Sequence, residues 1–208
     1  MEDRIKELAR QHMEKLAAGR PAPRKFSFEL PGTQEDMAAT LLGIYGAQVE
    51  GRDMEFVMDD ATEGKVERVV KWMYESRKRG LLLCGTLGNG KTTMLKSIKS
   101  LLEIRAEYFD AQSVFNFVKL NKTFPDILKS SVLLIDDLGV EPPSFNDFGE
   151  VRYPLAELLT SRYNQNLPTV IATNLTFDQI GEVYGDRLKD RMREMFAIII
   201  YREPSYRK

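Results

Sequence analysis

The sequence predicts an α/β protein in which a five-stranded, mostly parallel sheet lies between helices. From residue 80 onward, short runs of apolar and β-branched residues alternate with helical patterns, which indicates parallel strands joined by crossover helices. Several of the strand runs are apolar throughout rather than alternating, as expected when helices cover both faces of a sheet. The expected strands are residues 81–85, 106–110, 132–136, 169–173 and 197–201.

Helical patterns fill the intervals between these strands and also precede them. Within the α/β region, helices are expected at residues 91–104, 112–120, 149–165 and 177–194, the last with a break at Tyr184-Gly185. Two earlier helices are expected at residues 34–48 and 61–79. For the second of these, Asp59 or Asp60 is the expected N-cap and Glu63 the capping carboxylate.

Residues 1–18 show a charged amphipathic pattern that predicts a further helix. Its apolar residues fall roughly along one side: Ile5, Leu8, Met13 and Leu16. The segment 19–23 then ends the helix, because its prolines lack the backbone N–H and restrict the residue before them. We interpret residues 1–30 as a helical partner-binding segment and linker, and residues 31–208 as the core domain. The alternative, that the helix packs on its own core, stays open.

The composition fits a single globular domain and argues against several kinds of active site. The chain has 208 residues, of which 43% are hydrophobic and 29% charged, enough apolar material for one core. Disulfides, Cys/His zinc sites and Ser-His-Asp or Cys-His triads are not expected with one Cys and one His. Cys84 is expected to be a small core residue and His12 a solvated helix residue.

Nothing in the pattern of apolar and charged residues predicts a membrane protein. The longest apolar runs, at residues 81–84 and 196–201, are far shorter than the roughly 20 residues of a spanning helix. The N-terminus has no apolar signal core, so a cytoplasmic protein is expected. The net charge is −1, but basic residues gather at 71–105 and 185–208, either as solvated helix faces or as a surface for phosphates.

The strongest local motif is Gly85-Thr86-Leu87-Gly88-Asn89-Gly90-Lys91-Thr92, which matches the pattern G-x-x-x-x-G-K-[ST]. It follows an expected strand and opens an expected helix, which is the context that this phosphate-binding motif requires. The glycines let backbone N–H groups turn toward phosphates, and the helix N-terminus adds positive potential. Lys91 is expected to reach the β- and γ-phosphates, and Thr92 to offer its hydroxyl to Mg²⁺. The residues expected to bind the nucleotide here are Gly85, Thr86, Gly88, Asn89, Gly90, Lys91, Thr92 and Thr93.

A second motif supports a site for a nucleoside triphosphate and magnesium. The run from Val132 to Ile135 is apolar and is followed by Asp136 and Asp137. Carboxylates at the C-terminal end of a parallel strand lie on the ligand side of the sheet. Asp136 is expected to hold the Mg²⁺ shell together with Thr92, and Asp137 to polarise the attacking water.

Two further features are consistent with hydrolysis of the nucleotide. Asn174 follows the strand at 169–173, and it reaches the attacking water or the γ-phosphate if that strand lies beside the aspartate strand. Arg187 and Arg191 are four residues apart and share a helix face. They either pair with Asp190 and Glu194 in a solvated helix, or one of them serves the nucleotide of a neighbouring subunit.

Taken together, four segments resemble the AAA+ ATPases of the DnaC/IstB type, which are bacterial and phage helicase loaders and transposition helper ATPases. The segments are GTLGNGKT, VLLIDDLGVEPP, RYNQNLPTVIATNL and YGDRLKDRMRE, and the resemblance spans about residues 80–207. Phe26-Ser27-Phe28 is also similar to the motif that precedes the ATPase core in this family. The combination is specific, whereas no single segment is.

The resemblance implies an AAA+ P-loop core and a role for each matching residue. Walker A is residues 85–92 and Walker B residues 132–137. The implied catalytic residues are Lys91, Asp136 and Asp137, with Asn174 as sensor 1, Arg191 as the arginine finger and Arg187 beside it. Arg207 is implied as a nucleotide-binding sensor 2 residue.

Three departures from the wider family bear on this assignment. Position 137 is Asp where many AAA+ proteins carry Glu, and the shorter side chain is expected to slow hydrolysis. Seven residues follow the last expected strand, so a core without a helical lid domain is expected. The cysteines for a zinc-binding N-terminal domain are also lacking.

The function implied by the resemblance is an ATP- and Mg²⁺-dependent helicase loader. It would bind a replicative DNA helicase and single-stranded DNA, assemble with itself when ATP is bound, and use hydrolysis as a switch. The alternative is a transposition helper ATPase that directs a transposase. A small-molecule kinase and a nucleotide-binding adaptor without turnover are less well supported. Candidate DNA contacts, which ordinary surface or core positions would also explain, are Asn116, Lys119, Asn121, Lys122, Ser144, Phe145 and Asn146.

Overall fold

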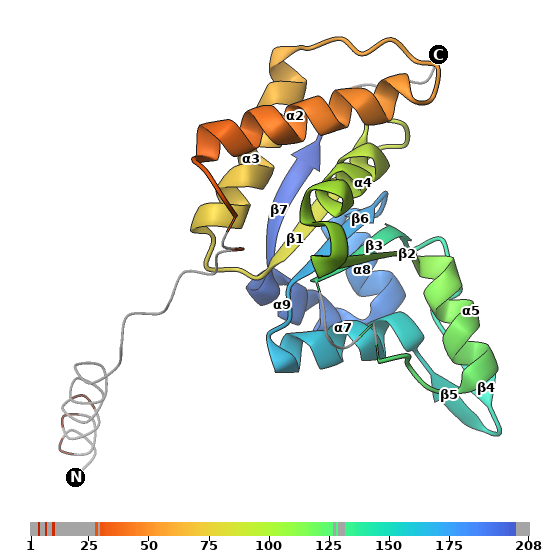
Figure 1. The fold of residues 1–208 in the computed structure, drawn as a ribbon. Helices are drawn as coiled ribbons and strands as arrows, with labels where there is room; N and C mark the ends of the chain where they lie inside the picture. The colour runs from red at the N-terminus through yellow and green to blue at the C-terminus, as the bar shows by residue number, and fades with distance from the viewer. Residues whose placement is uncertain are drawn as a thin grey trace.

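The structure is a computed structural model that describes residues 30–126, 128 and 132–202, together with Arg4, Glu7, Arg10 and Phe28. In this part of the chain a central sheet lies between two layers of helices (Figure 1). Apart from the positions just named, the N-terminal helix expected at 1–18 and the break at 19–23 fall outside the described residues. His12 and Arg207 fall outside them as well.

The main sheet consists of β1 (Gly80–Gly85), β2 (Ala106–Asp110), β3 (Val132–Leu138), β6 (Thr169–Thr173) and β7 (Phe196–Tyr201). Every pair of neighbours in this sheet is parallel, and the order is β2-β3-β6-β1-β7. The five-stranded parallel sheet predicted from the sequence is therefore confirmed. The order also brings the carboxyl ends of β1, β3 and β6 together at one edge, where ligands bind in open α/β sheets.

Helices cover both faces of the sheet, which explains why several strands are apolar throughout. In β1, Leu81 and Leu83 face one core, whereas Leu82 and Cys84 face the other. The first core is closed by α2 (Gln34–Glu50), α3 (Asp60–Glu75) and α4 (Lys91–Leu102). The second is closed by α5 (Ala111–Asn121), α7 (Pro154–Gln165), α8 (Phe177–Tyr184) and α9 (Asp186–Met195). Burial raises the pKa of the Cys84 thiol to about 11, as suits the core residue predicted.

The helices occupy the predicted intervals, with differences at their ends. Asp59 is the N-cap of α3, and its carboxylate accepts the N–H of Thr62 at 2.7 Å. This helix ends at Glu75 rather than at residue 79, because Ser76 is extended and its hydroxyl accepts the N–H of Lys78 at 3.0 Å. Helix α4 gives way to a 3₁₀ turn, η1 (Glu103–Arg105), which leads into β2.

The helix expected at 149–165 starts later than the sequence predicted, because a hairpin precedes it. β4 (Phe145–Asp147) pairs with β5 (Glu150–Arg152) in a two-stranded antiparallel sheet, and α7 begins only at Pro154. Phe148 and Gly149 form the turn, both with positive φ. The hairpin projects beside α5 at the edge of the molecule (Figure 1). The prediction of helix for residues 149–152 was therefore wrong.

Candidate functional site

The loop between β1 and α4 leaves the N-terminus of a helix open toward a cavity. Helix α4 begins at Lys91, and its N-cap Gly90 provides no side-chain hydrogen bond. The first turn of α4 contains no acidic residue either, so the positive end of the helix remains available for an anionic ligand. Gly90 has a φ of 92°, and a Cβ there would collide with the hydroxyl of Tyr45, so the position requires glycine.

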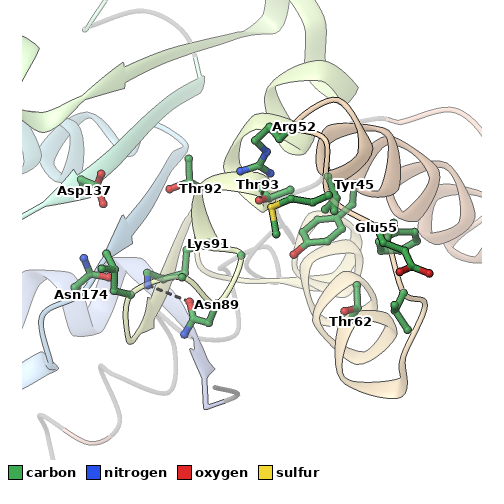
Figure 2. Close-up of a pocket in the computed structure, with 17 residues that line it drawn as sticks. Tyr45, Arg52, Glu55, Thr62, Asn89, Lys91, Thr92, Thr93, Asp137 and Asn174 are labelled. Carbon is green, nitrogen blue, oxygen red and sulfur yellow. Dashed lines mark hydrogen bonds between the residues drawn. The ribbon is translucent and has the colours of Figure 1, made fainter. Parts of the chain in front are cut away.

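Lys91 is buried at the base of this loop and folds back onto it. Its Nζ donates to the carbonyl oxygens of Gly85 at 2.9 Å and Thr86 at 2.7 Å, and to Oδ1 of Asn89 at 3.1 Å (Figure 2). The Nδ2 of Asn89 in turn donates to the carbonyl of Tyr201 at 3.2 Å, at the end of β7. The side chain of Asn89 therefore holds the loop in shape and ties it to the neighbouring strand.

Asp136 lies behind the loop and is only 3% exposed. Its Oδ1 accepts the Thr92 hydroxyl at 3.2 Å and the backbone N–H of Asp137 at 3.0 Å, while Oδ2 accepts the Tyr108 hydroxyl at 2.7 Å. Burial and the neighbouring Asp136 raise the pKa of Tyr108, which keeps its hydroxyl protonated as a donor. Sequence reasoning missed Tyr108, because its contact arises only from the pairing of β2 with β3.

Asp137 lies in β3, Asn174 directly follows the adjacent strand β6, and both side chains line the cavity (Figure 2). The register between β3 and β6 shifts between Ile135 and Leu138, and Asp137 has a positive φ of 53° at this irregularity. The hydroxyl of Thr173 donates to the carbonyl of Leu138 at 2.6 Å, which joins the two strand ends. The structure thus brings together the aspartate strand and the asparagine strand that the sequence analysis placed side by side only conditionally.

The cavity has a volume of about 250 Å³ and lies between the loop and the segment that follows α2. Its loop side contains most of the predicted nucleotide-binding residues: Gly88, Asn89, Gly90, Lys91, Thr92 and Thr93. Its far side was not predicted and consists of five apolar or aromatic residues, Tyr45, Val49, Met54, Phe56 and Val57, together with Arg52, Glu55 and Thr62. A polar, positively charged wall facing an apolar wall suits a ligand with an anionic end and a flat, less polar end.

The two arginines of α9 lie apart from this cavity. Among the described residues that line it, neither Arg187 nor Arg191 occurs. Arg191 donates to the Thr160 hydroxyl at 3.0 Å, and its guanidinium lies 5.6 Å from the centre of the Tyr163 ring. Arg187 is exposed on the same helix. Neither arginine therefore contacts the cavity of its own chain.

The candidate DNA contacts after β3 need one correction. Phe145 is 8% exposed and packs edge-on against Phe115, with ring centres 5.8 Å apart. Of the two alternatives, a DNA contact and a core position, Phe145 therefore takes the core position. Lys122 forms an ion pair with Asp147 at 2.9 Å and lies 4.8 Å from the Phe145 ring centre. Phe148 at the hairpin tip is a fully exposed aromatic residue of this region.

A buried carboxylate, also missed from the sequence, links the loop after β3 to the end of α8. Glu141 is 3% exposed, accepts the N–H of Gly139 at 3.0 Å and accepts the hydroxyl of Tyr184. Tyr184 is the last residue of α8, directly before Gly185 and α9. Burial raises the pKa of Glu141, although the hydrogen bond from Tyr184 partly opposes this. Nothing in the sequence indicated the contact between Glu141 and Tyr184, because Glu141 lies in an ordinary polar turn after β3 and its partner is 43 residues away.

The opposite pKa shifts of Glu141 and Glu157 predict opposite effects of pH on stability. The Glu141 pKa is raised, so its ionised form destabilises the fold progressively as pH rises above its ordinary value of 4.5. The Glu157 pKa is lowered by the hydrogen bond from Arg152, so its contribution is lost as pH falls below 4.5. Urea unfolding from about pH 3.5 to pH 7 tests both.

The two variants serve as each other's control. The unfolding free energy of wild type minus that of Glu141→Gln is expected to fall with rising pH. Wild type minus Glu157→Gln is expected to rise. If both differences change in the same direction, the assigned environments of these carboxylates are wrong.

Comparison with known proteins relates the fold to replication proteins. No protein-family model matches the chain, and no curated protein matches it significantly. The crystal structure of DnaI is 23% identical, covers 88% of this chain and 96% of its own, and superimposes with a TM-score of 0.53. A putative primosome component from Streptococcus pyogenes serotype M3 is 20% identical, with 74% and 85% coverage and a TM-score of 0.55.

Domain III of the Thermotoga maritima replication initiation protein DnaA is a third similar structure. It is 17% identical, covers 72% of this chain and 65% of its own, and has a TM-score of 0.50. At these identities the likeness concerns the fold. The resemblance to DnaC/IstB-type ATPases is supported at the level of the fold. The predicted fold class is confirmed: the chain has a five-stranded parallel sheet between helices, and it shares this fold with the three structures.

Proposed function

We propose that this protein is an ATP-dependent helicase loader of the DnaC/IstB type, which binds a replicative DNA helicase and helps place it on single-stranded DNA. The observation that carries the proposal is the convergence of Lys91, Thr92, Asp137 and Asn174 on one cavity, with Asp136 behind Thr92. The fold is shared with DnaI and with a protein described as a primosome component. We extend that role in replication to this chain.

In this proposal ATP lies with its phosphates at the N-terminus of α4 and its base against the apolar wall. Lys91 exchanges its bonds to the loop carbonyls for bonds to the β- and γ-phosphates. Thr92 and Asp136 would hold Mg²⁺, since a hydroxyl and a carboxylate 3.2 Å apart supply the oxygen ligands that this ion prefers. When bound, the ion neutralises charge on the phosphates.

Hydrolysis in this site uses side chains on both adjacent strands. Asn174 orients a water molecule whose oxygen attacks the γ-phosphorus, and Asp137 accepts the proton that this water loses. The bond from the γ-phosphorus to the bridging oxygen breaks, which leaves ADP and phosphate. The short side chain of Asp137 favours slow turnover, which suits a switch.

The remaining parts of the proposal concern neighbouring molecules. Arg191, with Arg187 beside it, serves the nucleotide of an adjacent subunit, which accounts for their place outside their own cavity. Single-stranded DNA meets the β4–β5 hairpin, where the fully exposed Phe148 offers a ring for stacking on a base.

In the described part of the chain, no helix combines the length and apolar character needed to cross a bilayer.

The loader function predicts a nucleotide-sensitive complex with the host's replicative helicase. Light scattering after size exclusion would compare mixtures with ATP·Mg²⁺ and without it, with Lys91→Ala as the control. We expect a complex whose amount changes with nucleotide for wild type and not for Lys91→Ala, and we expect deletion of residues 1–30 to abolish it. No complex in any state, together with ATP-dependent assembly on DNA, would instead support the transposition helper.

The trans-acting arginine predicts complementation between two inactive variants. Arg191→Ala and Lys91→Ala should each lack ATPase activity alone. Mixed in equal amounts, they should recover up to about a quarter of the wild-type rate, because about half of the sites keep Lys91 and about half of those meet an intact Arg191. The control is a mixture of Lys91→Ala with a variant that carries both Lys91→Ala and Arg191→Ala. This mixture should stay inactive, because none of its sites keeps Lys91. Absence of recovery in the first mixture would contradict a role in trans.

A further inference from the structure

Arg52 lies in the segment after α2, outside the Walker A and Walker B motifs, and it lines the cavity. Its Nη2 donates to the Thr93 hydroxyl at 2.5 Å, and its Nε donates to the carbonyl of Gln48 at 2.9 Å. Both acceptors are uncharged. Among the described residues, no carboxylate forms an ion pair with Arg52. A guanidinium therefore points into the proposed anion site from the wall opposite the phosphate loop.

The position of Arg52 along the cavity indicates which part of a nucleotide it meets. Asp137 and Asn174 lie at one end of the cavity, and Lys91 and Thr92 come next (Figure 2). Thr93 and Arg52 follow, and Tyr45, Glu55 and Thr62 lie farther along (Figure 2). In the proposed site, Asp137 and Asn174 lie next to the γ-phosphate, and Lys91 contacts the β- and γ-phosphates. Beyond Arg52 lies the apolar wall that suits a base. The α-phosphate falls between that wall and Lys91.

We infer that Arg52 binds the α-phosphate of the nucleotide and so joins the segment after α2 to the phosphate loop. This inference rests on the proposed nucleotide site. A nucleotide gives the guanidinium an anionic acceptor in place of the Thr93 hydroxyl, and such charge-assisted bonds are about twice as strong as neutral ones. Because ATP and ADP share the α-phosphate, Arg52 contributes equally to the affinity for both.

Calorimetric titration of the full-length protein with ATP and with ADP tests the inference. Arg52→Gln should weaken both nucleotides by about 10-fold or more, by the same factor, as expected for loss of a hydrogen bond to a charged group. Arg52→Lys keeps the charge and should recover part of the loss. The thermal midpoint without nucleotide should fall only slightly, because the two hydrogen bonds that are lost belong to an exposed side chain.

Arg68→Gln provides a matched control. Arg68 is exposed on α3, and its Nε also donates to the carbonyl four residues earlier, that of Gly64 at 3.0 Å, but it does not line this cavity. The Arg68→Gln variant should bind ATP and ADP with the affinities of the wild type. Unchanged affinities for Arg52→Gln, or a loss confined to ATP, would overturn the inference and leave the proposed function standing. A wild-type protein that binds neither nucleotide would overturn both.

Discussion

The architecture of the site depends on the buried ammonium group of Lys91. A charge removed from water is strongly destabilising unless hydrogen bonds satisfy it. Here two loop carbonyls and the Asn89 side chain supply them, so the loop must curl around the lysine. Asn89 then carries this constraint to the end of β7. The loop is thereby shaped before any ligand arrives, and an anion needs only to draw Lys91 away from its own backbone.

Strand order converts this local arrangement into a complete site. β6 lies between β1 and β3, so the asparagine that follows β6 stands between the phosphate loop and the aspartate strand. The irregular register between β3 and β6 turns Asp137 into the cavity, while Asp136 stays buried against Thr92 and Tyr108. In the loop that follows β3, the carboxylate of Glu141 accepts a hydrogen bond from the hydroxyl of Tyr184 at the end of α8. That contact joins the loop after β3 to the last residue of α8, two residues before the helix that bears Arg187 and Arg191 begins.

The central strands and the phosphate loop could be predicted because each is encoded by a continuous stretch of sequence. Apolar runs identified all five central strands, and the glycine-rich loop identified Lys91 and Thr92. The β4–β5 hairpin was missed because strands of three residues leave no periodicity. For the same reason the sequence did not show that Phe145 lies on a packed strand whereas Phe148 lies in the exposed turn. Tyr108, Glu141 and Arg52 were missed for another reason. Each acts through a partner far away in the sequence, so only the folded chain reveals the contact.

The central claim is that the cavity at the start of α4 binds a nucleoside triphosphate through Lys91. Titration calorimetry with ATP·Mg²⁺ on wild type, Lys91→Ala and Lys96→Ala tests it most directly, since Lys96 is an exposed lysine of the same helix. The account predicts that Lys91→Ala weakens binding by about 100-fold or more, as expected for loss of charged hydrogen bonds, while Lys96→Ala binds like wild type. Equal affinity of Lys91→Ala and wild type for ATP would contradict the account.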